Sequence, residues 1–387
     1  MVEAWPLHVP RYGERSLADL APSALGALGV AGESDIVGIG PASRVCILVV
    51  DGLGEEQRRG GAGLAPFLAA HAREPLTASF PATTAASLSS IGTGLPPGEH
   101  GLVGYTMAVP GRERVMNVLR WELYGHGPHV DMRGELPPER LQPVPTALER
   151  AARAGVSVSV LGPREHQGSG MTRAALRGGR YRPVFGLGDL VAGAAQALAE
   201  GTRSLVYAYH ADLDLIGHVR GAGSEAWRLQ LRTLDSAAAA LAERLPPGAA
   251  LVVTGDHGMV DVGEGDSLDV DDIAGLGDGV AALAGEPRMR HVHAVDGAAG
   301  DVLAAWRDTL GELFWVAPRD EAIAGGWFGP RVPDRVRARI GDVIAASRGR
   351  AVLVQRAVDP LQASLRGHHG SATDEEQSVP LVVARRD

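Results

Sequence analysis

Short apolar runs recur along the chain and alternate with stretches of helical periodicity. The runs lie at 45–50, 156–161, 204–209, 249–254 and 379–384. The first of them, 45–50, is apolar throughout, which is typical of a strand that is buried on both faces of a parallel sheet. Helices are predicted over 16–28, from the first run to about 72, and over 85–91, 146–155 and 224–245. This alternation predicts an α/β fold with a mostly parallel central sheet flanked by helices.

The pattern changes between residues 261 and 350. Asp-rich turns there surround a predicted strand at 290–295 and predicted helices at 301–313 and 333–346. A strand at 352–355 is predicted to bring the chain back to the core. Since 387 residues are many for one hydrophobic core, we expect an α/β core formed by 1–260 and 351–387, with a small inserted cap lobe at 261–350.

Composition narrows the possible partners. The net charge of −9 argues against nucleic acid, because a phosphate backbone requires a basic protein surface. Cys46 is the single cysteine and lies inside an apolar run, so we expect a buried, unreactive thiol. The first eleven residues show no leader pattern and no stretch is long enough to span a membrane, so we expect a cytoplasmic protein without a membrane partner. A homo-oligomer is left open.

Acidic and imidazole side chains follow three of the predicted strands. These are Asp51, the group Asp212, Asp214 and His218, and the pair Asp256 and His257, while a late loop adds His368 and His369. Each group alone is compatible with an ordinary turn or an exposed loop. Together they lie at the carboxyl ends of strands, where open α/β sheets bind their ligands. A mixture of Asp and His without thiolates suits Zn²⁺ or a similar divalent ion.

The stretch 79–104 carries a hydroxyl at a predicted helix boundary. Thr83 and Thr84 stand directly before the small-residue run 85–91, which glycines and prolines end. A threonine there can cap the helix, or it can face an anion held by the free N–H groups and the helix dipole. Thr84 is therefore either an N-cap or a nucleophile aimed at a phosphoryl group. A site with two metal ions would fit the second reading, because two cations can clamp the oxygens of an in-line displacement.

The order of these motifs resembles the alkaline phosphatase superfamily, and within it the nucleotide pyrophosphatase/phosphodiesterase branch. The matching segments are Asp51-Gly52, Pro81-Ala82-Thr83-Thr84, Thr93-Gly94 with His100-Gly101, Asp214 to His218, Asp256-His257-Gly258-Met259, and Gly367 to Gly370. They span the chain from about residue 45 to its end. The resemblance implies a hydrolase with two Zn²⁺ ions, Mn²⁺ or another divalent ion being possible, that acts on a small-molecule phosphate ester.

The resemblance also implies a role for individual residues. Thr84 would be the nucleophile and would share one metal with Asp51, Asp256 and His257. The second metal would be held by Asp214, His218 and His369. Thr83 and Ser79 are less favoured as nucleophiles, and His100 is expected to pack or to hydrogen-bond the glycine-rich loop. Asp212 and His368 are expected beside the metal ligands.

The sequence departs from the family where the substrate is expected. Tyr105 stands where nucleotide-hydrolysing members carry an asparagine, and Ala85-Ala86-Ser87 replaces their Asn-His. We expect Tyr105 and Trp121 to contact the substrate, with Arg164, His166 and Arg173 as further candidates. The predicted reaction is cleavage of phosphodiester or pyrophosphate bonds through a phosphothreonine. The alternatives are a phosphomonoesterase or phosphonate hydrolase of the same superfamily, and a catalytically silent metal-binding scaffold.

Overall fold

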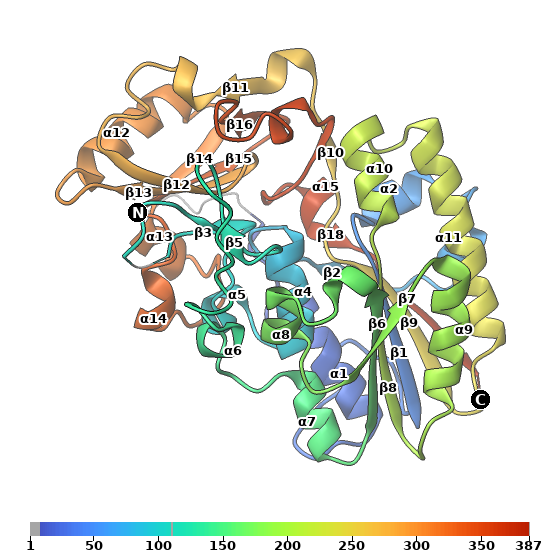
Figure 1. The fold of residues 1–387 in the computed structure, drawn as a ribbon. Helices are drawn as coiled ribbons and strands as arrows, with labels where there is room; N and C mark the ends of the chain where they lie inside the picture. The colour runs from blue at the N-terminus through green and yellow to red at the C-terminus, as the bar shows by residue number, and fades with distance from the viewer. Residues whose placement is uncertain (1–7, 110, 387) are drawn as a thin grey trace.

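Six strands form the central sheet, in the order β19-β9-β1-β8-β6-β7 (Figure 1). The computed structural model describes residues 8–109 and 111–386. The expectation about a leader pattern rested on the first eleven residues, and residues 1–7 of these lie outside the described residues. The strands are β1 (Arg44–Val50), β6 (Ser157–Pro163), β7 (Arg180–Val184), β8 (Ser204–His210), β9 (Ala249–Gly255) and β19 (Val382–Arg386). All neighbours are parallel except β19, which runs antiparallel to β9. The predicted α/β fold is confirmed.

Both faces of the sheet are covered by helices, which accounts for the uninterrupted apolar runs. Val45, Ile47 and Val49 of β1 pack into one core, and the residues between them pack into another. The first core includes residues of α1 (Leu20–Ala27), α4 (Thr84–Thr93), α7 (Ala147–Arg153) and α8 (Gly170–Ala175). The second includes α9 (Leu187–Leu198) and α11 (Glu225–Glu243). Cys46 belongs to the second core, where burial raises the pKa of its thiol to about 12.

Shorter elements connect the sheet to its surroundings. The predicted helix that ends near 72 is split into α2 (Glu55–Gly60) and α3 (Pro66–Ala70). The remaining helices of the core are α5 (Pro97–His100), α6 (Pro138–Leu141), α10 (Asp212–Arg220) and α15 (Asp374–Gln377). Small sheets pair β2 (Leu76–Thr77) with β18 (Ser378–Val379), β10 (Val260–Asp261) with β17 (Gly367–His368), and β3 (Thr106–Met107), β4 (Met116–Asn117) and β5 (Glu122–Leu123) with one another.

A second, smaller body stands beside the carboxyl edge of the sheet, orange in Figure 1. Its antiparallel sheet has the order β12-β13-β15-β14, from β12 (Val280–Glu286), β13 (Met289–Ala294), β14 (Phe314–Pro318) and β15 (Val343–Ser347). The helices α12 (Ala299–Leu310), α13 (Arg319–Ala324) and α14 (Asp334–Arg337) accompany it. Trp306, Phe314 and neighbouring side chains give this lobe a core of its own.

Two predicted elements in this region are wrong. The helix expected at 333–346 is only α14, and the second half of that range enters strand β15, which pairs on both sides with β13 and β14. The pairing buries every residue of β15, so tertiary packing overrides local helix propensity. The strand expected at 352–355 exists as β16 (Val352–Val354), but it pairs with β11 (Ser267–Asp269) and does not join the central sheet.

A buried ion pair fastens the lobe to the core. Arg288, in the turn between β12 and β13, donates two hydrogen bonds to Glu376 of α15, and both side chains are fully buried. Breaking such a pair by removing one partner leaves a buried charge without compensation. The lobe is therefore held in a fixed place relative to the loop that precedes α15. Among the described residues, no helix is long and apolar enough to cross a membrane.

Candidate active site

Three aspartates meet at the carboxyl edge of the sheet. Asp51 directly follows β1 and Asp256 directly follows β9, and the last residues of these two strands are paired neighbours. Asp214 comes from the first turn of α10, after β8. Gly52 makes this approach possible, because its φ is +73° and a Cβ there would lie 2.9 Å from the Asp214 backbone. The strand ends therefore gather carboxylates that are far apart in sequence.

The hydrogen bonds of these aspartates leave oxygens unused. Oδ1 of Asp256 accepts from the N–H groups of Gly52 and His257, both at 3.1 Å, while its buried Oδ2 has no hydrogen-bond partner in the part of the chain that the structure describes. Oδ1 of Asp214 is likewise buried without one. Oδ2 of Asp51 accepts from the hydroxyl of Tyr209. Buried carboxylate oxygens without partners are unfavourable unless something else satisfies them.

Three histidines present the same ring nitrogen to these carboxylates. The Nδ1 atoms of His218, His257 and His369 lie 2.7, 2.9 and 2.8 Å from the backbone oxygens of Gly367, Gly258 and Ala82. A carbonyl oxygen only accepts, so each Nδ1 donates and each neutral ring keeps its lone pair on Nε2. Nε2 of His218 lies 3.1 Å from Asp214, and that of His257 lies 3.4 Å from Asp51. The backbone thus orients the Nε2 atoms of three histidines toward one cluster.

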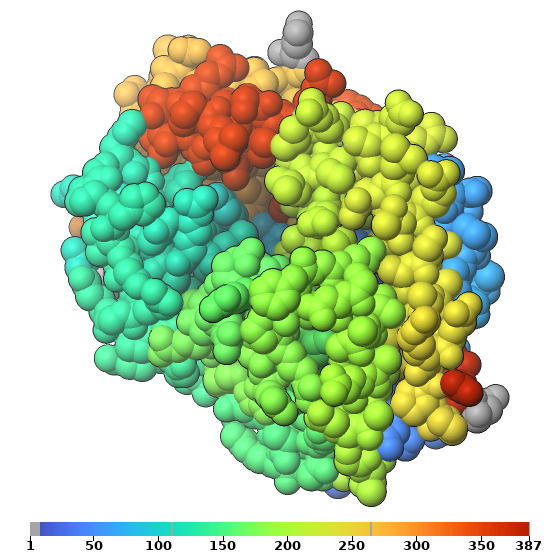
Figure 2. All heavy atoms as spheres, turned by 45° about the vertical axis from the view of Figure 1, so that its right-hand side comes forward, coloured from blue at the N-terminus to red at the C-terminus, as the bar shows by residue number. Residues whose placement is uncertain are grey.

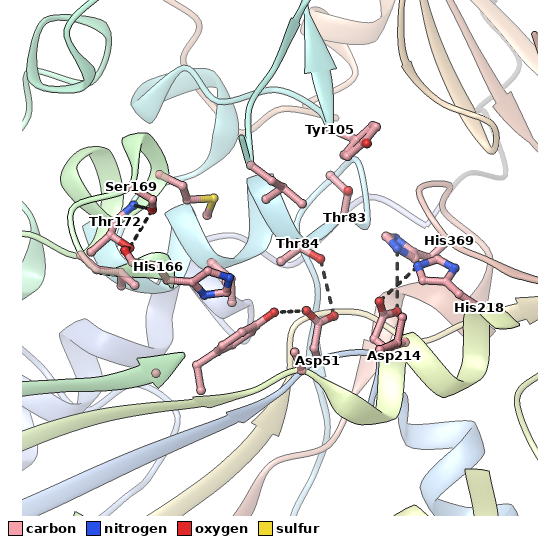
Figure 3. Close-up of a pocket in the computed structure, with 18 of the residues that line it drawn as sticks. Asp51, Thr83, Thr84, Tyr105, His166, Ser169, Thr172, Asp214, His218 and His369 are labelled. Carbon is pink, nitrogen blue, oxygen red and sulfur yellow. Dashed lines mark hydrogen bonds and ion pairs between the residues drawn. The ribbon is translucent and has the colours of Figure 1, made fainter. Parts of the chain in front are cut away.

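Thr84 brings its hydroxyl to the same cluster. Thr83, with extended backbone angles, occupies the N-cap of α4, and Thr84 is the first helical residue. Its Oγ1 lies 3.1 Å from Nε2 of His257 and 3.5 Å from Oδ1 of Asp51. Figure 3 shows Thr84 directed toward Asp51, with His218 and His369 above Asp214. Of the two readings of Thr84, the N-cap belongs to Thr83 and Thr84 faces the carboxylates.

These donor atoms fit divalent metal ions. Asp51, Asp256 and His257 each offer a ligand atom within 4.8 Å of the others, and so do Asp214, His257 and His369. Burial and the nearby Asp256 and Asp214 carboxylates raise the pKa of Asp51, and burial raises the pKa of Asp256. A cation would relieve this repulsion and would satisfy the unpartnered oxygens. The cluster has the composition of a zinc site and the acceptor capacity for more than one ion.

The pKa values of the His218 and His369 rings are shifted in opposite directions. Burial lowers the pKa of both rings, and that of His369 falls well below its ordinary value. The Asp214 carboxylate overrides burial at His218 and raises the pKa of that ring to about 9. Ring stacking of His257 on His369, with centroids 3.5 Å apart, brings the two clusters of donors together. His257 is accordingly the residue that both groups of donor atoms share.

A pocket of about 350 Å³ opens from this cluster. Its mouth is the hollow in Figure 2 where the green segment around α8, the lime α10 and the red-orange segment before β17 approach one another. Asp51, Thr84, Asp214, His218 and His369 line one end. Tyr105 and His166, both expected near the substrate, also line it. None of the described residues that line it is an arginine or a lysine.

Other candidates lie away from the pocket. Trp121 is fully buried, and its indole N–H donates to the backbone oxygen of Leu136, so the expectation that it contacts the substrate is wrong. It packs instead behind Gly170 at the start of α8. Arg173 is engaged by Glu139 in two hydrogen bonds of 2.8 Å. Asp212 is exposed.

The remaining expectations concern hydrogen-bonding residues near the site. His100 is buried, and its ring contacts the Ser90 hydroxyl and the Leu102 N–H. The Ser79 hydroxyl donates to Ser90, and Ser79 does not line the pocket. His368 lines the pocket, and its ring centroid lies 6.4 Å from that of His218.

Sequence reasoning missed two residues of the site. Tyr209 donates to Asp51, and its position near the end of β8 could have identified it, since side chains at strand ends reach the carboxyl edge. Glu286 of β12 lines the pocket, and its Oε2 accepts the Tyr105 N–H at 2.8 Å. Burial raises the pKa of Glu286 to about 8. It comes from an antiparallel strand of the lobe, so no motif pointed to it.

The comparisons with known proteins agree with this fold. The family model of type I phosphodiesterases/nucleotide pyrophosphatases matches residues 45–372. No curated protein sequence matches the chain significantly. Human ectonucleotide pyrophosphatase/phosphodiesterase 5 is a similar solved structure, with 17% identity, coverage of 88% of this chain and 87% of that one, and a TM-score of 0.65. The murine protein gives 16%, 87% of each chain and 0.62.

A second kind of relative has the same fold. Phosphonoacetate hydrolase from Sinorhizobium meliloti 1021, solved in complex with phosphonoformate, is 22% identical, covers 90% of this chain and 91% of its own, and has a TM-score of 0.65. At these identities the likeness to the solved structures shows the fold alone. The match of the family model runs from β1 through the loop of His369, and so includes every candidate metal ligand. The chain therefore belongs to the type I phosphodiesterase/nucleotide pyrophosphatase family.

Proposed function

We propose that this protein is a metal-dependent hydrolase that cleaves phosphodiester or pyrophosphate bonds of small molecules through a phosphothreonine at Thr84. One observation carries the proposal. The hydroxyl of Thr84 lies beside a cluster of two buried aspartates, the partly buried Asp214, and three histidines whose Nδ1 atoms are all engaged by backbone oxygens. Histidines that only pack have no reason to share one tautomer, whereas histidines that bind metal through Nε2 all carry their proton on Nδ1.

The chain offers ligands for two ions. Asp51, Asp256, His257 and Thr84 would hold one, and Asp214, His218 and His369 would hold the other. Zinc suits this mixture of imidazole and carboxylate best, and Mn²⁺ is the alternative. Ions held there would supply positive charge that stabilises both the Thr84 alkoxide and the charge that develops on the phosphoryl oxygens.

The reaction follows from the position of Thr84. Its Oγ1 attacks phosphorus, the bond from phosphorus to the leaving oxygen breaks, and the leaving group departs as an alcohol or phosphate that takes up the proton lost by Thr84. Water then attacks the phosphothreonine, the bond from phosphorus to Oγ1 breaks, and Thr84 regains a proton. The N-terminus of α4 favours negative charge at this point through its free N–H groups and its dipole.

The walls of the pocket favour a diester over a monoester. A monoester dianion carries more charge than a diester, and a site that prefers it usually adds a cation. The described residues around the pocket include no arginine or lysine, and Glu286 adds a further carboxyl group. The same argument disfavours a phosphonate that bears a second acidic group.

The test uses two neighbouring threonines. Zinc-loaded wild-type protein should hydrolyse bis(p-nitrophenyl) phosphate, and Thr84→Ala should lower kcat by about 1,000-fold or more, as loss of a covalent nucleophile does. Thr83→Ala is the matched control, because its hydroxyl lies outside the set of donors, and it should change kcat by less than about tenfold. Equal losses in the two variants would contradict the role of Thr84, and a wild-type protein without diester turnover would favour the silent scaffold.

A further inference from the structure

The end of the pocket away from the aspartates is apolar, and the pairing of neighbouring strands places the side chains that line it. Val160 of β6 is paired with Tyr181 of β7 on one side and with Tyr207 of β8 on the other. Residues paired across neighbouring strands share a face of the sheet, so these three side chains form a continuous floor. Leu88 of α4 and Met171 and Leu176 near α8 complete the walls.

Two tyrosines of β8 lie at different depths in this pocket. Tyr209 touches Asp51 through its hydroxyl, so it marks the end of the pocket beside Thr84. Tyr207 stands two residues earlier on the same face of the strand and therefore about 7 Å farther from the carboxyl edge. Both tyrosines line the pocket. Tyr207 therefore lines a deeper part of the pocket than Tyr209.

The three tyrosine hydroxyls differ in what they bind. Tyr209 donates to Asp51, and Tyr181 donates to the backbone oxygen of Pro163 at 2.7 Å. The hydroxyl of Tyr207 has no hydrogen-bond partner among the described residues, and the residue is only 1% exposed. A buried hydroxyl without a partner is costly, so a polar group of a ligand would be favoured beside it.

We propose that this apolar pocket binds one ester group of the substrate, an uncharged ring-sized group such as an aryl ring, whose far end hydrogen-bonds the Tyr207 hydroxyl. The proposal rests on the proposed function, which places the phosphorus beside Thr84. The pocket disfavours charged groups, because an anion would lose its hydration there and no cation among the described lining residues would balance it. The substrate class is therefore an aryl ester of phosphate rather than a doubly charged metabolite.

Binding of phosphonates to zinc-loaded protein tests this without requiring turnover. Calorimetry should show that phenylphosphonate binds at least about tenfold more tightly than methylphosphonate, since the ring buries additional apolar surface. Val160→Phe fills the floor and should remove that preference while leaving methylphosphonate unchanged. Equal binding of the two ligands by wild-type protein would overturn the proposal.

The hydroxyl is tested by a matched pair of variants. 4-Hydroxyphenylphosphonate should bind wild-type protein about fivefold more tightly than phenylphosphonate, and Tyr207→Phe should abolish that difference. Tyr181→Phe is the control, because its hydroxyl already has a partner, and it should keep the difference. A difference that survives in Tyr207→Phe would refute the role of Tyr207. Failure of these binding tests leaves diester hydrolysis intact, whereas absent hydrolysis with a retained aryl preference would overturn only the proposed function.

Discussion

Glu286 permits a quantitative prediction about stability and pH. Its carboxyl group is 3% exposed, and its Oε2 accepts the Tyr105 N–H. Burial raises its pKa from 4.5 to about 8, against the opposing effects of that N–H group and of Arg290. Glu286→Gln keeps the shape of the side chain and its acceptor oxygen, but the amide cannot ionise.

The sign of the effect follows from proton binding. Between these two pKa values the folded protein holds one proton that the unfolded chain has released, so raising the pH lowers the free energy of unfolding. The slope is about 1.4 kcal/mol per pH unit, and the whole window corresponds to roughly 5 kcal/mol. The Glu286→Gln variant lacks this loss. Relative to wild type, it should gain about 3 kcal/mol between about pH 5.5 and about pH 7.5.

Urea unfolding at several pH values measures this difference. Both proteins are studied with a chelator, so that the titration of the metal-ligand cluster is common to them and cancels in the comparison. Glu312→Gln is the control, because Glu312 is exposed, and its curve should run parallel to that of wild type. If the Glu286→Gln curve also ran parallel to wild type over this range, the reasoning about the buried carboxyl group would be refuted.

Two further predictions concern the pocket and its support. Trp121→Ala should lower the free energy of unfolding by about 3–5 kcal/mol, as truncation of a buried aromatic residue does, which thermal unfolding measures. It should leave the ratio of the kcat/KM values for a diester and a monoester unchanged. A changed ratio in steady-state kinetics would show that Trp121 does contact the substrate. Wild-type protein should show a higher kcat/KM for bis(p-nitrophenyl) phosphate than for p-nitrophenyl phosphate, and a clear monoester preference would contradict the argument from the missing cation.

The central sheet could be predicted because its strands are buried on both faces. Residues 45–50 and 249–253 are apolar without interruption, and short runs of this kind are typical of strands in a parallel sheet. The motif residues that follow these strands could be expected at one edge, since parallel strands end there together. The lobe could not be read in the same way. Its strand β15 contains Val343-Ile344-Ala345-Ala346-Ser347, in which β-branched residues and alanines favour different structures, and its two partner strands decide for the strand.

The walls of the pocket were harder to predict than the metal ligands. Trp121 lies in a loop-rich stretch, where an aromatic residue is equally compatible with a binding wall and with the core, and only its burial decides for the core. Glu286 and Tyr207 enter the pocket through the register of strands, which no local pattern reveals. Candidate metal ligands that lie in sequence motifs can therefore be named before the fold is known, whereas the residues that line the walls of the pocket depend on the fold.

Metal content tests the central claim most directly. Protein that has been incubated with excess zinc and then desalted should retain close to two ions per chain when it is analysed by inductively coupled plasma mass spectrometry. Asp256→Ala and His369→Ala should each retain less metal, because each removes a ligand that the other donors cannot replace. A single tightly bound ion in the wild-type protein, unaffected by either substitution, would contradict the two-metal site.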